Sequence, residues 1–282
     1  MNSIAVLLTV HNRKEKTIEC LKRLFDQEIP KDFNISVFLT DDGCTDGTRE
    51  EVQRNFPSVN IVNGDGNLYW NRGMWAAWEA ASKSEHDYYL WINDDTFLYE
   101  GAILNLINTS AQKENMAIIV GACQSLDHRY MTYGGQTKER KLVVPDGCVK
   151  DVFVFNGNIV LIPNYVFKKV GNLDYYYLHD MGDIDYGLRA GKEGVLIFQC
   201  SVYLGECDRH EKLSNWCNPN IPFRKRWKGL HSPLGQPPQI RFYYAKKHEG
   251  IISALIHYLL LYIRCLFPWI WTSLEKDVFV KK

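Results

Sequence analysis

The stretch Tyr88-Tyr89-Leu90-Trp91-Ile92-Asn93-Asp94-Asp95 decides how this sequence of 282 residues folds. Its first five residues are all apolar or aromatic, which predicts a buried strand, and strands buried on both faces belong to parallel sheets covered by helices. Two adjacent carboxylates then stand at the carboxyl end of that strand, where open α/β sheets place their ligands. Because unpaired buried carboxylates are costly, we expect a cation or a set of hydrogen-bond donors to meet them.

The carboxylates of Asp94 and Asp95 have two interpretations. Oxygen ligands at a strand end suit Mg²⁺ or Mn²⁺, and proteins commonly share these ions with substrate phosphates. Alternatively, either side chain caps a helix that begins near Glu100. Other segments of the chain favour the first interpretation.

Composition is that of a globular protein, with 46% hydrophobic and 23% charged residues. The 33 basic and 33 acidic residues balance, so nothing indicates nucleic-acid binding. The apolar run Ile4–Leu8 has no basic leader before it, so we expect no secretory signal. Eight cysteines are scattered without a Cys-x-x-Cys pair, which favours reduced thiols in a cytosolic protein over disulfides or a zinc site.

Apolar periodicity predicts alternating strands and helices in the first half of the chain. We expect strands at residues 3–10, 35–40, 61–62, 88–93 and 117–121, and helices at residues 14–27, 46–55, 70–82 and 102–110. This alternation predicts an α/β fold with a mostly parallel sheet and helices on both faces. Turn signals follow from residue 130 to 161, then a short helix at 182–191 and a last strand at 195–202.

Four segments, taken in order, carry a family resemblance. They are Val6–Arg13, which ends in Thr-Val-His-Asn-Arg; Thr40–Thr48, which contains Asp-Asp-Gly-Cys-Thr-Asp-Gly-Thr; Asn93–Thr96; and Gly182–Arg189. Together they resemble the GT-A-fold glycosyltransferases, especially the large inverting family 2 with its bacterial polysaccharide and rhamnosyltransferase-like members. Two departures stand out: Asn93 replaces the first acid of the family's Asp-x-Asp, and Gly182 replaces the Glu of its Glu-Asp-x-Asp-x-x-x-Arg segment.

The resemblance implies a domain over residues 1–210, with a nucleotide-binding half at 1–122 and an acceptor-binding half at 123–210. The donor would be a nucleotide sugar, UDP- or dTDP-linked, because a carboxylate such as Asp41 can accept the imide N–H of uracil or thymine. The expected donor-nucleotide residues are Thr9, His11, Arg13, Asp41, Asn67, Arg72 and Asp94. Plain alternatives exist: turn chemistry for Asp41 and Asp42, a mere connection around Asn67 and a solvated helix face for Arg72.

The resemblance also implies a divalent cation, Mn²⁺ or Mg²⁺. Asp95 would hold this ion, and His210 would complete the metal or diphosphate site. There the ion would neutralise the charge that develops as the nucleoside diphosphate leaves. A surface histidine on a basic loop is the alternative for His210.

Asp183 maps onto the family's general base. Transfer with inversion needs one carboxylate that takes the proton of the acceptor hydroxyl. A helix cap is the simpler role for this residue, and Asp180 is the fallback for the base. Asp185 and Arg189 are expected to support the acceptor side, with Arg189 pairing with nearby carboxylates.

Residues 211–282 are expected to form a C-terminal appendage, a basic and aromatic loop followed by an apolar helix. Residues 251–271 are apolar nearly all round, but Arg264 and Pro268 make them a poor spanning helix, which needs ~20 apolar residues. An interfacial helix flanked by lysines, with tryptophans at the headgroup level, fits better. A helix packed on the domain or on a second subunit is the alternative, which leaves a homodimer open.

The expected protein is thus a metal-dependent inverting glycosyltransferase of surface-polysaccharide synthesis. It would move a hexosyl or deoxyhexosyl group to a hydroxyl of a saccharide or lipid-linked acceptor, in the cytoplasm on the inner face of the membrane. A sugar-phosphate nucleotidyltransferase is a rival, although Thr9–Lys14 lacks the glycines of its triphosphate loop. A non-catalytic nucleotide-sugar-binding protein is another: Asp95 and Asp183 argue against it, whereas Asn93 and Gly182 leave it open.

Overall fold

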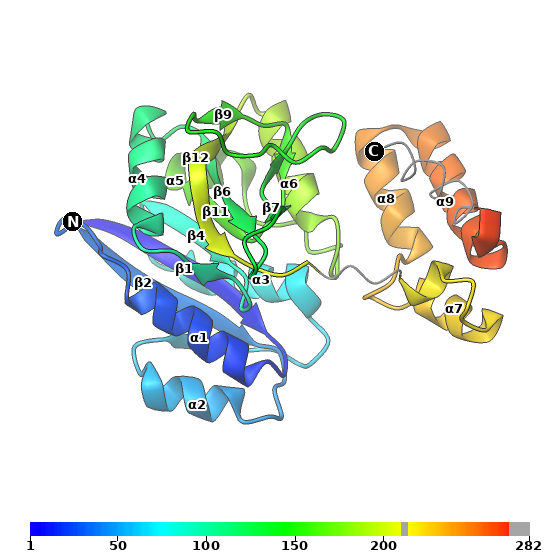
Figure 1. Cartoon of the computed structure of the whole chain (residues 1–282), viewed down its shortest axis with the longest axis horizontal. Coiled ribbons are helices and arrows are strands. Elements are labelled where there is room, and N and C mark those ends of the chain that lie inside the picture. The colour runs from blue at the N-terminus through cyan, green and yellow to red at the C-terminus, as the bar shows by residue number, and fades with distance from the viewer. Residues whose placement is uncertain (210–213, 271–282) are drawn as a thin grey trace. The chain divides into compact units, whose positions relative to one another are not determined.

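A computed structural model describes residues 1–209 and 214–270 of the chain. The chain divides into two units, Met1–Arg209 and His210–Lys282. Both are drawn in Figure 1. The first unit carries all four of the segments on which the family resemblance depends.

A mixed sheet forms the centre of the first unit. Its main strands are β1 (Asn2–Val10), β2 (Phe33–Asp41), β3 (Asn60–Asn63), β4 (Tyr88–Ile92), β5 (Phe97–Leu98), β6 (Ile118–Gln124), β11 (Ile159–Pro163) and β12 (Ile197–Glu206). They lie in the order β3-β2-β1-β4-β11-β6-β12-β5. Short strands complete the unit: β7 (Met131–Tyr133) pairs with β6, β9 (Lys150–Asp151) pairs with β12, and β8 (Gly135–Gln136) pairs with β10 (Val154–Phe155).

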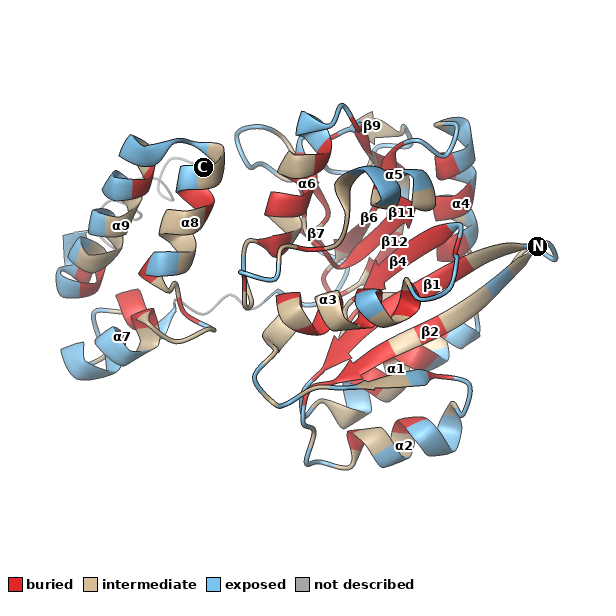
Figure 2. Ribbon diagram, turned by 180° about the vertical axis from the view of Figure 1, so that it is seen from behind, coloured by how far each residue is buried: buried red, intermediate tan, exposed pale blue. Residues whose placement is uncertain are grey.

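Helices cover both faces of this sheet, as Figures 1 and 2 show. Residues of α1 (Lys14–Phe25), α2 (Thr48–Asn55) and α4 (Ala102–Gln112) share one apolar core, and residues of α3 (Tyr69–Ala81), α5 (Asn164–Val170) and α6 (Gly182–Lys192) share the other. Strand β1 shows why two cores form. Ile4, Val6 and Leu8 belong to the first core, whereas Ala5 and Leu7 belong to the second, because successive side chains of a strand point to opposite faces. The predicted α/β fold with helices on both faces is confirmed.

The strand directions in the sheet are less regular than the sequence predicted. β1 is parallel to β2 and to β4, and β6 is parallel to β12. β11 lies between β4 and β6 and is antiparallel to both, with Ile159 opposite Ile92. The sheet is therefore mostly parallel, with one reversed strand at its centre.

The segment after β4 differs from one of the interpretations considered above. Helix α4 is capped at Gly101, with no side-chain cap bond, and β5 separates it from the acidic pair. Asp94 and Asp95 therefore do not cap α4. Their carboxylates are left for other partners at the end of β4.

The second unit contains a helix where the apolar helix was expected, and it is also helical in part of the expected loop. It contains the 3₁₀ turn η1 (Asn215–Cys217) and the helices α7 (Phe223–Leu230), α8 (Pro238–His248) and α9 (Ile251–Leu266). Pro238 occupies the first turn of α8, where the missing N–H of proline costs nothing, so the proline pair starts a helix here. Over residues 1–209 and 214–270, no helix combines the length and the apolar character that a membrane crossing requires.

Candidate active site

The carboxyl ends of the parallel strands bring the predicted site residues to one edge of the sheet. β1 and β2 are in register up to Val10 and Asp41, and β4 runs parallel beside β1. β11 runs the opposite way, so the residues that precede it lie at this same edge. The edge therefore combines the segments after β1, β2 and β4 with Gly157 and Asn158 before β11.

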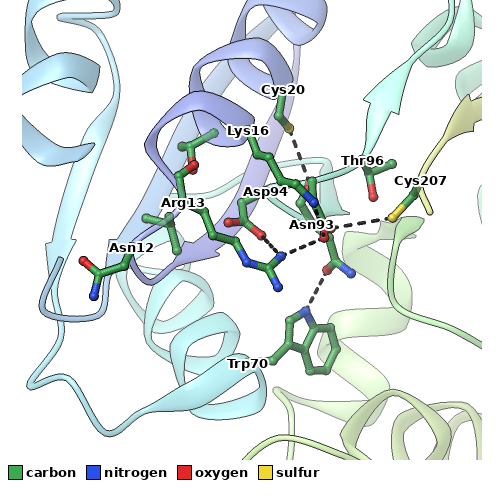
Figure 3. A network of polar contacts seen from close by, with 12 residues as sticks. Asn12, Arg13, Lys16, Cys20, Trp70, Asn93, Asp94, Thr96 and Cys207 are labelled. Carbon is green, nitrogen blue, oxygen red and sulfur yellow. Dashed lines mark hydrogen bonds and ion pairs between the residues drawn. The ribbon is translucent and has the colours of Figure 1, made fainter. Parts of the chain in front are cut away.

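Two basic side chains at the start of α1 contact the acidic pair after β4 (Figure 3). Nη1 of Arg13 lies 2.7 Å from Oδ2 of Asp95 and 3.3 Å from Oδ1 of Asp94. Nζ of Lys16 lies 3.9 Å from Oδ2 of Asp95. The thiol of Cys207, just after β12, is 3.6 Å from the other oxygen of Asp95. Of the predicted donor and metal residues, Arg13, Asp94 and Asp95 are the ones in direct contact.

Burial of the acidic pair is not fully offset by its ion pairs and hydrogen bonds. It raises the pKa of Asp94 to about 7, against the opposing effect of Arg13. Oδ2 of Asp94 is buried and has no hydrogen-bond partner among the described residues. An orphaned carboxylate oxygen beside a second carboxylate fits Mg²⁺ or Mn²⁺, which take oxygen ligands and commonly complete their shell with water and phosphate oxygens.

The second expected metal ligand, His210, lies outside the described residues. Within residues 1–209 and 214–270, no cluster of three or more histidine, cysteine or acidic side chains is arranged to hold a metal ion. Among the described residues, Asp94 and Asp95 are thus the two carboxylates that a cation could meet at this strand end.

Turn-stabilising bonds engage the residues expected to bind the nucleobase. Oδ1 of Asp41 accepts the N–H of Cys44 at 2.8 Å, and Nδ1 of His11 lies 2.6 Å from the carbonyl oxygen of Asp42. Thr9 is buried beneath α3, against Gly73. The turn chemistry considered for Asp41 is therefore present, and it leaves the second carboxylate oxygen 3.4 Å from Nη1 of Arg49.

Asp42 fastens the loop between β3 and α3. Its carboxylate accepts the backbone N–H groups of Gly66, Leu68 and Tyr69 at 2.8 to 3.0 Å. Asn67 projects from this loop as an exposed residue whose own N–H bonds to Asp65. The loop is thus held in a fixed path past the ends of β1 and β2.

Arg72 contacts the loop before α6. Its Nε donates to the carbonyl of Tyr175 at 2.9 Å, and its guanidinium lies over the Tyr175 ring at 4.5 Å. The structure therefore places Arg72 on the side of α3 that faces residues 174–178, and shows no contact between Arg72 and the acidic pair.

Asp183 occupies a different environment from the acidic pair. Its Oδ2 accepts the N–H of Gly157 at 3.0 Å, and its Oδ1 accepts the N–H of Ile184 at 2.8 Å. No ion pair involving this carboxylate occurs within the described part of the chain, and burial raises its pKa to about 6. The N-cap of α6 is Met181, so Asp183 lies inside the first turn and not at the cap position considered above.

A short path of contacts joins Asp183 to the segment of the acidic pair. Nε1 of Trp70 donates to Oδ1 of Asn93 at 2.7 Å (Figure 3). The ring of Trp70 lies against Gly157, where an added Cβ would be 2.5 Å from the indole. Gly157 in turn donates to Asp183. The ring of Trp70 therefore lies between Asn93, which precedes the acidic pair, and Gly157, which contacts Asp183.

The departure at Gly182 has a steric cause. A Cβ there would lie 1.7 Å from Oδ1 of Asn71, whose amide group donates to the carbonyls of Asp174 and Tyr177 at 2.9 and 3.0 Å. Asn71 thus occupies the space that a longer side chain at position 182 would need. Glycine is required because α3 and the loop before α6 approach each other so closely.

The remaining acceptor-side residues form a buried support. Asp185 is fully buried and accepts from the hydroxyl of Tyr177 at 3.1 Å and from Nε of Arg189 at 2.8 Å. The other guanidinium nitrogens of Arg189 donate to backbone carbonyls at positions 170 and 172. Asp180, in contrast, is exposed beside His179, with 3.8 Å between the carboxylate and Nε2.

Comparison with known proteins identifies the family. Residues 5–146, half of the chain, match the sequence model described as glycosyl transferase family 2. The protein belongs to this family. No curated protein sequence matches the chain.

Solved structures of glycosyltransferases have the same fold. TarS of S. aureus has a TM-score of 0.58 at 11% identity, over 92% of this chain and 43% of TarS, so the chain spans less than half of that protein. The mannosyltransferase PcManGT of Pyrobaculum calidifontis, solved with GDP-Man and Mn²⁺, has a TM-score of 0.57 at 12% identity, over 97% of this chain and 84% of the other. TarS 1–349 with UDP-GlcNAc scores 0.57 at 12% identity, over 93% and 81%. The predicted GT-A fold is confirmed.

Several residues of this glycosyltransferase site were missed by sequence reasoning. Lys16 follows Arg13 by three positions, which places both on one side of a helix start, and that spacing was a usable signal. Trp70 and Gly157 lie far apart in the sequence and far from the positions they contact, so no local pattern marks them. Cys207 stands directly after the last strand, where its proximity to Asp95 depends on strand order.

Proposed function

We propose that this family 2 glycosyltransferase is a metal-dependent, inverting enzyme. It transfers a hexosyl or deoxyhexosyl group from a nucleoside diphosphate to a hydroxyl of a saccharide or lipid-linked acceptor in surface-polysaccharide synthesis. One observation carries the proposal: two kinds of carboxylate lie at one sheet edge, joined through Trp70. Among the described residues, the acidic pair has an oxygen without a hydrogen-bond partner, and Asp183 has no counter-ion. The acidic pair suits a diphosphate with its cation, and Asp183 suits acceptance of a proton.

Asp95 and Asp94 would hold Mn²⁺ or Mg²⁺, with His210 as the proposed further ligand. Bound there, the cation neutralises the charge that gathers on the leaving diphosphate. The Mn²⁺ in the PcManGT structure supports this choice of ion. Thr9, His11, Arg13, Asp41, Asn67 and Arg72 are proposed to surround the nucleotide, with Asp41 at the nucleobase.

Asp183 is proposed as the general base. The N–H groups of Gly157 and Ile184 fix its orientation, and a pKa of about 6 leaves it ionised at neutral pH yet more basic than an ordinary aspartate. As the acceptor oxygen bonds to the anomeric carbon, the bond from that carbon to the diphosphate breaks and the hydroxyl proton passes to Asp183. Attack opposite the leaving group inverts the anomeric centre. Asp180, Asp185 and Arg189 support this side of the site.

A donor screen tests the proposal. The full chain is incubated with Mn²⁺ and a panel of UDP-, dTDP- and GDP-linked sugars, and release of nucleoside diphosphate is followed with and without a saccharide acceptor. We expect release from one donor class, lost when EDTA is added, and a product of inverted anomeric configuration. Release of pyrophosphate from a nucleoside triphosphate would instead favour a nucleotidyltransferase, and product with retained configuration would remove Asp183 from its role.

We further propose that α9 binds the inner face of the membrane at the lipid–water interface. One side of this helix carries the exposed residues Ile252, Leu255, Ile256, Leu259 and Ile263, and it appears as pale blue turns in Figure 2. Between residues 214 and 270, Glu249 is the single acidic residue, whereas basic residues are numerous: Arg224, Lys225, Arg226, Lys228, Arg241, Lys246, Lys247 and Arg264. An apolar helix face within a basic unit is complementary to an anionic lipid surface.

Flotation with vesicles of phosphatidylglycerol and phosphatidylcholine tests this. Leu259→Asp changes a residue that is 60% exposed on α9, and Leu196→Asp changes one that is 64% exposed in the first unit. We expect the α9 variant to lose roughly tenfold or more in vesicle affinity, since burying a leucine is worth about 1.5–3 kcal/mol, and the control to float like the parent chain. A parent chain that stays off vesicles and sediments as a dimer, with Leu259→Asp monomeric, would assign the helix face to a second copy.

A further inference from the structure

The acidic pair already has a cation of its own, and this cation comes from the protein. Arg13 contacts both carboxylates through one nitrogen, and Lys16 stands 3.9 Å from Asp95. We propose that Arg13 is an internal counter-ion that a divalent cation has to displace, and that the freed guanidinium then pairs with the donor diphosphate. This inference rests on the metal-dependent function proposed above and adds an order to it: the cation binds well only together with the nucleotide.

The backbone that carries Arg13 is fixed. Asn12, at a φ of 52°, accepts the N–H of Thr45 through its side chain at 2.7 Å. The N–H of Lys14 donates to Asp46 at 3.0 Å, and the N–H of Thr17 donates to the carbonyl of Arg13 at 2.9 Å. These bonds attach both flanks of Arg13 to the turn after β2 and to α1. Any movement of the guanidinium therefore has to come from the side chain itself.

The side chain of Arg13 is free to make such a movement. It is 39% exposed, whereas its partner Asp95 is 11% exposed. Arginine has several rotatable bonds, and a half-exposed guanidinium loses little packing when it changes rotamer. The carboxylates, held at the end of a buried strand, stay where they are. The pair is therefore the fixed half of the contact and Arg13 the movable half.

Charge explains why the exchange requires the nucleotide. A divalent cation bound to Asp94 and Asp95 would stand beside the guanidinium that now occupies this position, and like charges at such a separation repel each other in a half-buried site. A nucleoside diphosphate brings oxygens that an arginine can bind through two parallel N–H groups. It thus supplies both the missing metal ligands and a new partner for Arg13. Binding of cation and nucleotide is then positively coupled, and the coupling is mutual.

Mn²⁺ binding tests the inference without any turnover. The electron paramagnetic resonance signal of free Mn²⁺ is titrated with the full chain, with Arg13→Gln and with Arg23→Gln. Arg23 is the matched control, because it lies on the same helix, is 43% exposed and pairs with a carboxylate, Glu19, at the same 2.7 Å. We expect Arg13→Gln to bind Mn²⁺ alone about 5- to 150-fold more tightly than the parent chain, the usual range of coupling between two ligands, and Arg23→Gln to be unchanged.

The nucleotide arm gives the opposite sign. With Mn²⁺ at a saturating concentration, Arg13→Gln should bind UDP or GDP more weakly than the parent chain does, because the diphosphate has lost its arginine partner. Lys16→Gln should shift Mn²⁺ affinity in the same direction as Arg13→Gln but less, since its contact is longer. Asp95→Asn combined with Arg13→Gln should abolish the gain, which places the added Mn²⁺ at this pair.

Two results would overturn the inference in distinguishable ways. Equal affinity of the parent chain and Arg13→Gln for Mn²⁺ alone would show that Arg13 does not compete with the ion, while the metal-dependent function stands. Absence of Mn²⁺ binding in every variant, with nucleotide or without, would remove the metal itself and leave Arg13 as the permanent partner of the pair.

Discussion

The acidic pair and Asp183 are both at least partly buried carboxylate sites at one sheet edge, yet they are built in opposite ways. Asp94 and Asp95 lie against the cations of Arg13 and Lys16, and one of their oxygens has no partner in residues 1–209 and 214–270. Asp183 accepts two backbone N–H groups and pairs with no cation in the part of the chain that is described. The first site is arranged for exchange of positive charge, and the second is arranged to take up a proton.

The difference shows that the surroundings of an aspartate determine what it can do. Neutral amide donors orient a carboxylate while leaving its basicity available, because burial opposes the charged form and no counter-ion restores it. At the acidic pair, Arg13 opposes the effect of burial without cancelling it, since the pKa of Asp94 is still raised to about 7. Another cation can enter this site only by exchange with the basic side chains already there. Substitutions at the two sites separate these behaviours.

Asp95→Ala should abolish Mn²⁺-dependent binding of the nucleoside diphosphate. The change removes the carboxylate that touches both Arg13 and Lys16. The divalent cation then loses this ligand, and the two basic side chains lose this partner. Calorimetry with UDP and GDP measures the affinity, and Asp127→Ala, in an exposed ion pair with Arg129, is the control. Unchanged, metal-dependent affinity in Asp95→Ala would break the assignment of the pair to the diphosphate.

Asp183→Asn should leave donor binding intact and lower the rate of transfer by roughly 10²–10⁴-fold, the usual contribution of a general base. The amide keeps the shape of the side chain and removes its basicity. Asp180→Asn should be milder, because that side chain is exposed. Single-turnover transfer separates rate from binding. An inactive Asp180→Asn beside an active Asp183→Asn would move the base to the neighbouring loop.

The acid side of the pH profile should report the same carboxylate. With a pKa of about 6, Asp183 is ionised above that pH and protonated below it, and only the ionised form accepts a proton. The rate of transfer at low acceptor concentration should therefore be flat above pH 6 and fall about tenfold for each unit below it. Asp183→Asn should lose this slope, and a slope retained in that variant would belong to another group.

Gly182→Ala should destabilise the contact between α3 and the loop before α6. Its Cβ would meet Oδ1 of Asn71 at 1.7 Å, whereas Gly191, on the same helix, has open space. Overpacking of this kind costs about 1–3 kcal/mol, and glycine to alanine in an open helical position gains up to ~1 kcal/mol. Urea unfolding of Gly182→Ala and Gly191→Ala should give opposite signs. Equal effects would mean that Asn71 moves away easily and does not set the distance between α3 and the loop before α6.

Sequence patterns predicted the strands that build the carboxyl edge almost residue by residue. The apolar run of β4 was expected over residues 88–93 and occupies Tyr88–Ile92, because five buried side chains in a row leave few alternatives. The reversed direction of β11 was not predicted. Its residues Ile159–Pro163 are all buried, and an apolar run reads the same in either orientation, so only pairing with β4 and β6 decides it.

Sequence reasoning could name residues of the candidate site, but it could not predict their contacts. The resemblance named Arg13, Asp95 and Asp183, but it assigned Arg13 to the nucleotide, and the ion pair with Asp95 spans 82 positions of sequence. The bond from Gly157 to Asp183 spans 26. The apolar helix of the second unit was predicted, whereas α8 was missed for a different reason. A proline pair breaks a helix in its interior and starts one at its first turn, and composition alone does not distinguish the two.

The reversed strand β11 has a consequence for how this chain can change. Because β6 and β11 are antiparallel neighbours, the segment between Gln124 and Ile159 begins and ends at the same edge of the sheet. Within it, β7 pairs with β6 and β9 pairs with β12. These pairs fix parts of the segment, and its length can change most readily at the exposed turn of residues 138–141. The segment ends at Gly157, the partner of Asp183. The exposed turn at residues 138–141 can therefore change in length or sequence while β4, the acidic pair and the base keep their places. Val154 and Phe155 in the same segment are fully buried, and Phe155 packs on α6, so this part of the segment belongs to the fixed frame.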